Sequence, residues 1–271
     1  AWRPQAKPGR PKGGDAFERK LTKWVADRDA KLVKKMTKPE LRAAWGTLIG
    51  RKAPAFKDIT REKVDEFKRD GYIEFLDILR LKKHGEVLPV VSLYPKNWNK
   101  NVQIILSGEG KSALFDDKGN PRTDIQKLLD AGSAVVSADL FQQGEFLKAS
   151  LEQTRKVRNN REYAGYSFGY NHTLFAHRVH DVMTLVAWVT GFEEEKPEAI
   201  SLNGRGASGP IVVAATSQVG GLLWVGVGNS DFRFADLRSY RDPNFLPGAV
   251  KYGDLLTLEK ISKVPVVHIK K

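Results

Sequence analysis

The stretch Gly204-Arg205-Gly206-Ala207-Ser208-Gly209-Pro210 decides how this chain is interpreted. The apolar run from Ala199 to Leu202 predicts a short buried strand before it, and Pro210 to Ser217 predicts a helix after it. Glycine permits tight turns and close backbone approach, so the stretch is typical of a sharp connection between two such elements. The sequence therefore predicts a strand–turn–helix unit here.

Further apolar strands lie on both sides of this unit. The expected helices Thr123 to Ala131 and Leu174 to Thr190 fill the gaps before it, and each ends near a glycine. An alternation of buried strands and helices predicts an α/β fold, with a mostly parallel sheet covered by helices on both faces. The expected strands are 102–106, 134–138, 199–202, 222–227 and 264–269.

The residues before this series of strands and helices have a different sequence pattern. Two β-prone runs, Tyr72 to Leu81 and Val87 to Tyr94, are joined by a polar turn with glycine, which predicts an antiparallel pair. The residues before Gly71 have helical spacing, and we expect Trp24 and Trp45 to be core anchors there. The expected organisation is a flexible basic arm (1–14), a helical N-terminal extension (15–70) and an α/β domain (71–271).

Composition excludes several classes of function. The 271 residues carry a formal net charge of +13, which favours anionic partners, and no cysteine, which excludes disulfides, thiolate metal sites and a Cys nucleophile. No segment approaches the roughly 20 consecutive apolar residues of a membrane span, so we expect a soluble protein. The chain starts at Ala1 without a signal-type apolar core, which leaves the compartment open, with export to the periplasm or the extracellular space as one option.

Three further motifs follow strands or lead into a helix: Gly108-Glu109-Gly110-Lys111, the segment 138–145 and the segment 169–181. The segment 242–249 is a fourth. In this order they resemble the α/β-hydrolase superfamily, nearest to bacterial acetyl-xylan-esterase-like and dienelactone-hydrolase-like proteins. The resemblance covers roughly Tyr72 to the end. It implies a three-layer sandwich that binds ligands beyond the carboxyl ends of its strands, and acyl transfer without a cofactor.

The resemblance assigns positions within the glycine-rich turn. In the superfamily the nucleophile stands on a G-x-S-x-G elbow, which places Gly204 at the first glycine and Gly206 at the nucleophile position. Glycine has no side chain that can attack an ester. A register shifted by two residues makes Ser208 the nucleophile, but it puts Pro210 where a small residue should pack, so a capping or small-residue role is favoured for Ser208.

The other catalytic parts follow from the same resemblance. It implies an oxyanion hole formed by the backbone N–H of Ala207 and a second N–H from the loop at Gly108, Glu109 and Gly110. The family's acid and histidine follow late strands and have no counterparts before Lys271, so either the protein is degenerate or its C-terminal part is missing. Asp231 is an alternative acid, although local backbone capping is favoured for it.

Two other kinds of site rank lower. His177, His180 and Asp181 share one face of a predicted helix, but the H-x-x-x-H spacing and an obvious third ligand are absent, so we expect a polar helix surface and no metal. Gly204, Gly206 and Gly209 match the dinucleotide pattern G-x-G-x-x-G, yet the unit occurs late in the sheet, so nucleotide binding ranks last.

The leading hypothesis is a divergent α/β hydrolase that resembles carbohydrate (acetyl-xylan) esterases, weakly active or inactive because Gly206 occupies the nucleophile position. Its ligand would be an acylated carbohydrate or another ester. The alternative is a non-catalytic binding or scaffold module that holds an anionic polymer or a protein partner through the former cleft or the basic N-terminal extension. The substrate and the oligomeric state stay open.

Overall fold

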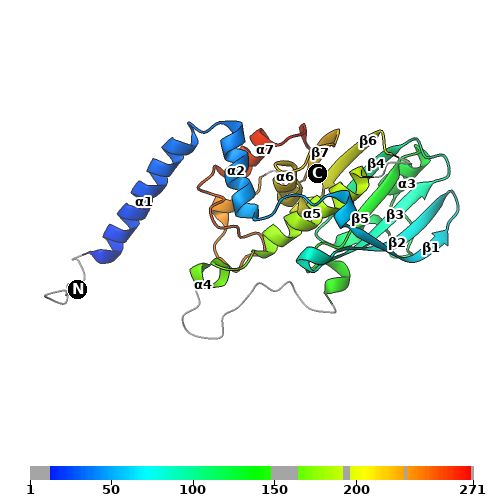
Figure 1. The fold of residues 1–271 in the computed structure, drawn as a ribbon, viewed down its shortest axis with the longest axis horizontal. Helices are drawn as coiled ribbons and strands as arrows, with labels where there is room; N and C mark the ends of the chain where they lie inside the picture. The colour runs from blue at the N-terminus through cyan, green and yellow to red at the C-terminus, as the bar shows by residue number, and fades with distance from the viewer. Residues whose placement is uncertain (1–12, 148–163, 192–195, 229–230, 270–271) are drawn as a thin grey trace.

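A computed structural model describes residues 13–147, 164–191, 196–228 and 231–269. They form one mixed sheet with helices on both faces (Figure 1). The predicted arm over residues 1–14 lies almost entirely outside the described residues. Across the sheet the strands follow in the order β1 (Thr60–Lys68), β2 (Tyr72–Leu81), β3 (Glu86–Pro95), β5 (Ala134–Ala138), β4 (Asn101–Leu106), β6 (Ala199–Gly204), β7 (Trp224–Val227) and β8 (Val266–His268).

The strand directions confirm the predicted architecture. Strands β5, β4, β6, β7 and β8 pair in parallel, whereas β3 is antiparallel to both β2 and β5. Because both faces of the inner parallel strands are covered, β4, β5, β6 and β7 are mostly buried, whereas the edge strand β8 is largely exposed. The carboxyl ends of the parallel strands therefore meet at one edge, which holds the turn after β6.

Strand β1 corrects the predicted helical extension over residues 15–70. Its sequence, Thr-Arg-Glu-Lys-Val-Asp-Glu-Phe-Lys, is mostly charged and exposed, so the alternation of apolar residues that marks a strand is weak. The strand exists because it pairs with β2 along its whole length, from Thr60 opposite Arg80 to Lys68 opposite Ile73. Charged side chains on such an edge strand also oppose pairing with other chains.

The helices form two outer layers. On one face α3 packs through Ile125 and Leu129 against β3 and β5. On the other face the larger core cluster joins α5 and α6 to the sheet, and α2 contacts α5 and α7. No helix in the described ranges is long and apolar enough to cross a membrane. The helices are α1 (Gly14–Val33), α2 (Lys38–Ile49), α3 (Thr123–Asp130), α4 (Ala164–Phe168), α5 (Leu174–Thr190), α6 (Gly209–Thr216) and α7 (Asp254–Ile261).

Helix α2 attaches the N-terminal extension to the body. It begins with a capping box between Thr37 and Glu40 and ends at Gly50, whose φ of 79° is favoured only for glycine. Trp45 is fully buried, lies 6.0 Å from the ring of Phe234, and donates its indole N–H to the Tyr252 carbonyl. The predicted role of Trp45 as a core anchor is therefore confirmed.

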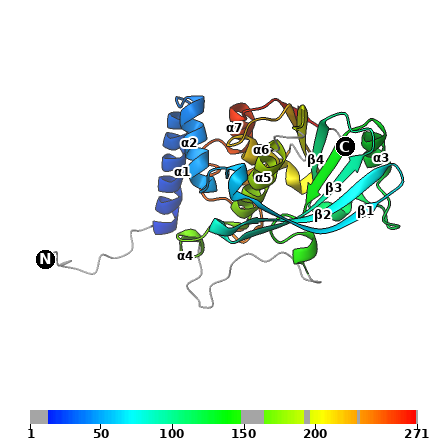
Figure 2. The same ribbon diagram turned by 45° about the vertical axis from the view of Figure 1, so that its right-hand side comes forward.

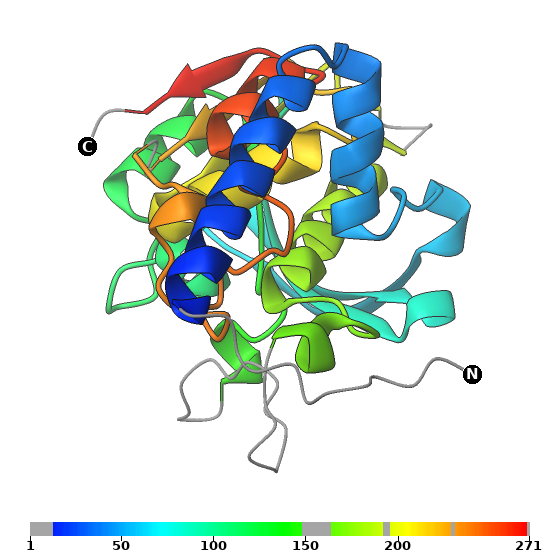
Figure 3. The ribbon, with the colours of Figure 1, turned by 90° about the vertical axis from the view of Figure 1, so that its left-hand side faces the viewer.

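Helix α1 differs from the prediction. Figure 1 shows it extending away from the sheet, and Figures 2 and 3 show it beside α2 on the side that carries α7. Trp24 is 58% exposed, so its predicted role as a core anchor is wrong. The physical reason is that α1 presents Asp29 to the body, where it pairs with Lys251, which leaves Trp24 on the solvent side.

Replacement of the two tryptophans should separate these roles. We expect Trp45→Ala to lower the free energy of unfolding by about 3–5 kcal/mol, because it removes a fully buried side chain. Trp24→Ala should change it by less than about 0.5 kcal/mol. Urea denaturation followed by far-UV circular dichroism measures both values. Equal stability of the two variants would show that α2 is not part of the core.

Candidate functional site

The turn after β6 lies at the edge where the parallel strands end. The Arg205 N–H donates to the Leu106 carbonyl at 2.8 Å, and the Gly228 N–H donates to the Gly204 carbonyl at 2.8 Å. These bonds hold the end of β6 between the ends of β4 and β7. Gly206 then has a φ of +52°, and the chain turns directly into α6. The predicted strand–turn–helix unit is therefore present.

The three glycines of this turn serve different purposes. A Cβ on Gly204 would lie 2.6 Å from a Val212 methyl group, and one on Gly209 would lie 1.9 Å from the Gly228 oxygen. Both positions are therefore restricted to glycine by close packing. A Cβ on Gly206 would meet nothing within 4 Å. The tip of the elbow thus faces open space but carries no side chain.

Ser208 lies beneath the turn. Its side chain is fully buried, and its Oγ has no hydrogen-bond partner among the described residues. A nucleophilic serine must face the substrate and lie within hydrogen-bond reach of a base. The location of Ser208 suits a small packing residue, the role that its position before Pro210 favours.

The loop after β4 approaches the elbow. A Cβ on Gly108 would lie 3.5 Å from the Ala207 Cβ, so the two segments expected to form the oxyanion hole are adjacent. The Glu109 N–H donates to Ser107 Oγ at 3.3 Å, and the Gly110 N–H donates to the Ser107 carbonyl at 3.1 Å. Of the three predicted loop positions, Glu109 and Gly110 therefore have N–H groups that are already bonded within the loop.

Asp139 ties this loop to the segment after β5. Its buried carboxylate accepts the Lys111 N–H at 2.8 Å, the Lys111 ammonium at 2.6 Å and the Glu145 N–H at 3.1 Å. A Cβ on Gly110 or on Gly144 would lie 2.2 Å from the same carboxylate, and both glycines have positive φ. The two loops therefore wrap closely around Asp139 and are held together beside the elbow.

Asp231, the alternative acid, and His268, the histidine of the last strand, are not hydrogen-bonded to Ser208. Asp231 is exposed in the turn that follows β7. His268, in β8, lies 3.7 Å from a Glu259 carboxylate oxygen. Because Ser208 Oγ has no partner in the described part of the chain, these residues do not form a hydrogen-bonded catalytic set.

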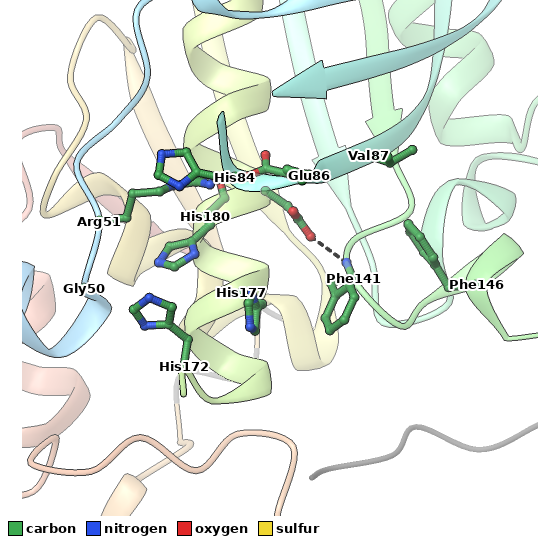
Figure 4. Close-up of a pocket in the computed structure, with 12 residues that line it drawn as sticks. Gly50, Arg51, His84, Glu86, Val87, Phe141, Phe146, His172, His177 and His180 are labelled. Carbon is green, nitrogen blue, oxygen red and sulfur yellow. Dashed lines mark hydrogen bonds and ion pairs between the residues drawn. The ribbon is translucent and has the colours of Figure 1, made fainter. Parts of the chain in front are cut away.

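A pocket that the sequence did not predict lies beside α5. Its volume is about 330 Å³, and Figure 4 shows side chains from α5, from the β2–β3 connection and from the loop after β5 around it. The rings of His172 and His180 are 5.0 Å apart, and His177 lies 5.7 Å from each of them. This histidine pocket is lined by Arg51, His84, Glu86, Phe141, Phe146, His172, His177, His180 and Asp181, with Gly50, Gly85 and Val87.

His180 and Asp181 are buried, which corrects the predicted polar helix surface. His180 Nε2 lies 2.6 Å from the Ile49 carbonyl, and burial, helped by the nearby Arg51 charge, lowers the pKa of His180 to about 3. Burial raises the pKa of Asp181, whose carboxylate accepts the Phe141 N–H at 2.6 Å. The two side chains therefore connect α5 to neighbouring segments and do not converge on a common point.

The described residues contain no group of three or more His, Asp or Glu side chains that could hold a metal ion. Arg51 connects the N-terminal extension to this pocket, because it pairs with Glu86 and donates to the His180 carbonyl at 2.9 Å. The sequence signal for a buried polar cluster was the position of His180 and Asp181 between Val179 and Val182, in a helix whose second half is mostly apolar.

Comparisons with known proteins define the fold. The sequence matches no protein-family model and no curated protein sequence. The structure is similar to a Bacteroides fragilis protein with a provisional acetyl xylan esterase assignment (TM-score 0.58, 14% identity, 86% of this chain and 67% of that one). It is also similar to acetyl xylan esterase 1 from Thermoanaerobacterium sp., with a TM-score of 0.52 and 17% identity over 86% of this chain and 82% of that one. A glucuronoyl esterase from Solibacter usitatus has a TM-score of 0.56 and 12% identity over 88% of this chain and 74% of that one. The chain therefore has the α/β-hydrolase fold seen in these carbohydrate esterases.

The elbow glycines should respond differently to substitution. We expect Gly206→Ser to lower the free energy of unfolding by about 1–2 kcal/mol, the cost of a left-handed conformation for a residue with a side chain. Gly209→Ser should lower it by about 3 kcal/mol or more, because its Cβ would overlap the Gly228 oxygen. Chemical denaturation of the two variants tests this order. The reverse order would contradict the close packing described above.

His180 should make stability depend on pH. Its folded pKa of about 3 lies below the usual value of 6.5, so the unfolded chain binds the proton more readily, and stability falls as pH decreases from about 7 towards 3. The raised pKa of Asp181 acts in the opposite direction, but it is common to the wild type and a His180→Gln variant. We expect the stability of the wild type to fall more steeply between pH 7 and 5 than that of the variant, as measured by urea denaturation. Parallel curves would contradict the assignment.

Proposed function

We propose that this chain is a divergent carbohydrate-esterase-like domain that binds an acylated carbohydrate, or a related ester, without hydrolysing it through an elbow serine. The observation that carries the proposal is the tip of the elbow, where Gly206 has the positive φ of the turn and open space around it but no nucleophile. The nearest serine in sequence, Ser208, is buried beneath the turn. Serine-dependent acyl transfer would therefore lack its attacking atom.

Backbone N–H groups at the turn provide a physical basis for binding an ester. The Ala207 and Gly108 segments are adjacent at the elbow, and backbone N–H groups at the start of a helix attract the oxygen of a carbonyl or carboxylate. Such donors need no catalytic side chain. The bonds between Asp139 and Lys111 hold the Gly108 loop in place, so the donors are arranged before a ligand arrives.

A second proposed role belongs to the N-terminal extension. Helix α1 extends from the body with Phe17, Leu21 and Trp24 exposed along one side at helical spacing. Arg28, one turn further along, lies 5.3 Å from the Trp24 ring. An exposed apolar stripe of this kind favours a protein partner over an anionic polymer as the target of the scaffold function.

Ester turnover tests the proposal at the elbow. We expect wild-type protein and Ser208→Ala to release p-nitrophenol from p-nitrophenyl acetate at the same low rate, because the Ser208 hydroxyl does not reach the substrate. A fluorophosphonate probe, which labels activated serines, should label neither protein. Labelling of Ser208 in the wild type, or loss of turnover in Ser208→Ala, would show that Ser208 is a nucleophile and would disprove the proposal.

Binding at the elbow can be tested with a matched pair of variants. Gly206→Ala and Gly206→Leu impose the same backbone strain, but only the leucine side chain fills the open space at the tip. We expect an acetylated xylo-oligosaccharide to bind the wild type and Gly206→Ala, and to bind Gly206→Leu at least about tenfold more weakly, which corresponds to about 1.4 kcal/mol. Isothermal titration calorimetry gives the three affinities. Equal affinity for both variants would place the ligand elsewhere.

A further inference from the structure

A second pocket of about 360 Å³ lies over the antiparallel strands β1, β2 and β3. Its wall contains the aromatic side chains of Phe75, Tyr94, Trp98 and Trp188, together with the polar side chains of Arg61, Asp77 and Ser92. None of these residues lines the histidine pocket or belongs to the elbow turn. We refer to it as the aromatic pocket.

The aromatic pocket extends to the sheet edge opposite the elbow. Strand β3 runs antiparallel to β5, and Leu93 pairs with Val135 near the start of β5. Tyr94 and Trp98 therefore lie towards the amino-terminal ends of the parallel strands. Trp188 comes from the last turns of α5, whose first residues lie at the histidine pocket. The aromatic pocket is therefore independent of the proposed ester site.

Its aromatic rings form one rigid group. Tyr94 and Trp98 have ring centroids 5.4 Å apart at 77°, and Phe75 and Tyr94 have centroids 6.0 Å apart at 76°. These are edge-to-face arrangements, which hold the rings in fixed orientations. The Trp98 indole N–H also donates to the Asn101 carbonyl at 2.9 Å. All three rings are only half-buried, so part of each apolar surface stays accessible.

Two polar side chains of the pocket have oxygen atoms without a hydrogen-bond partner among the described residues. Arg61 Nε donates to Asp77 Oδ1 at 2.8 Å, whereas Asp77 Oδ2 has no hydrogen-bond partner among the described residues. Ser92 Oγ also lacks one within the described part of the chain. Asp77 and Ser92 are almost completely buried, and unpaired buried oxygens are unfavourable in a folded protein. Both side chains belong to the pocket lining, so a rotation towards the pocket would present these oxygens to a ligand that donates hydrogen bonds.

We propose that the aromatic pocket binds a neutral pyranose ring, as a sugar-binding site separate from the elbow. A pyranose has apolar C–H faces that pack on aromatic rings, and its hydroxyls both donate and accept, which suits the Asp77 carboxylate and the Arg61 guanidinium side by side. The charged side chains of the lining, Arg61 and Asp77, form an ion pair with each other, so the pocket favours neither an anion nor a cation. A purely apolar ligand would leave Asp77 Oδ2 and Ser92 Oγ unpaired.

The test is a titration of the whole chain with xylohexaose, followed by the indole N–H signals in ¹H–¹⁵N NMR spectra. We expect the Trp98 signal, assigned from a Trp98→Phe variant, to shift on addition of the oligosaccharide. Ser92→Ala should keep full stability, because the lost hydroxyl has no partner in the free protein, but it should weaken binding roughly three- to tenfold. Trp98→Ala should weaken binding at least about tenfold through loss of the ring.

Trp24→Ala is the matched control, since it removes an exposed tryptophan far from the pocket and should leave binding unchanged. No shift of the Trp98 signal at millimolar xylohexaose or cellohexaose would overturn the proposal. Unchanged affinity in both Trp98→Ala and Ser92→Ala, or a Trp98 shift caused by p-cresol but not by the oligosaccharides, would do the same. The Gly206→Leu variant distinguishes the two sites. It should lower the affinity for the ester ligand and leave the binding of xylohexaose at Trp98 unchanged.

Discussion

The close approach of the backbone at Gly204, Gly209 and Gly228 is the constraint on which the rest of this structure depends. A methyl group at Gly209 would overlap the Gly228 oxygen, and one at Gly204 would overlap Val212. Because no side chain separates these segments, the short 3-10 turn Gly206–Ser208 is enough to connect β6 to α6, and the start of α6 packs against the turn after β7. This geometry places the tip of the elbow at the sheet edge and turns Ser208 inward.

The glycine at that tip has a physical consequence beyond the missing nucleophile. A residue with a side chain at the φ of Gly206 is strained, whereas glycine adopts it freely. The turn between β6 and α6 is therefore free of the strain that a side chain at position 206 would add. The neighbouring loop after β4 is held separately, by the bonds between the Asp139 carboxylate and Lys111, so its arrangement does not depend on a side chain at position 206.

Buried polar side chains join parts of the chain that are distant in sequence. Arg51 comes from the segment after α2, yet it pairs with Glu86 at the start of β3 and donates to a carbonyl of α5. Asp181 in α5 holds the backbone after β5 through Phe141. The N-terminal extension is thus part of the wall of the histidine pocket, although α1 itself contacts the body only sparingly and exposes its apolar side.

The sequence by itself determined the elements whose signals are local. Periodicity and flanking glycines predicted the bounds of β2, β5 and α5 to the residue, and the glycine-rich stretch before Pro210 predicted the strand–turn–helix unit. Only the tertiary structure decided the rest. Strand β1 exists through pairing with β2 across a charged sequence, and Trp24 and Trp45, similar in sequence context, differ because Asp29 rather than an apolar side chain faces the body. The histidine and aromatic pockets unite residues from separate strands and helices, and no local pattern encodes which distant side chains will meet.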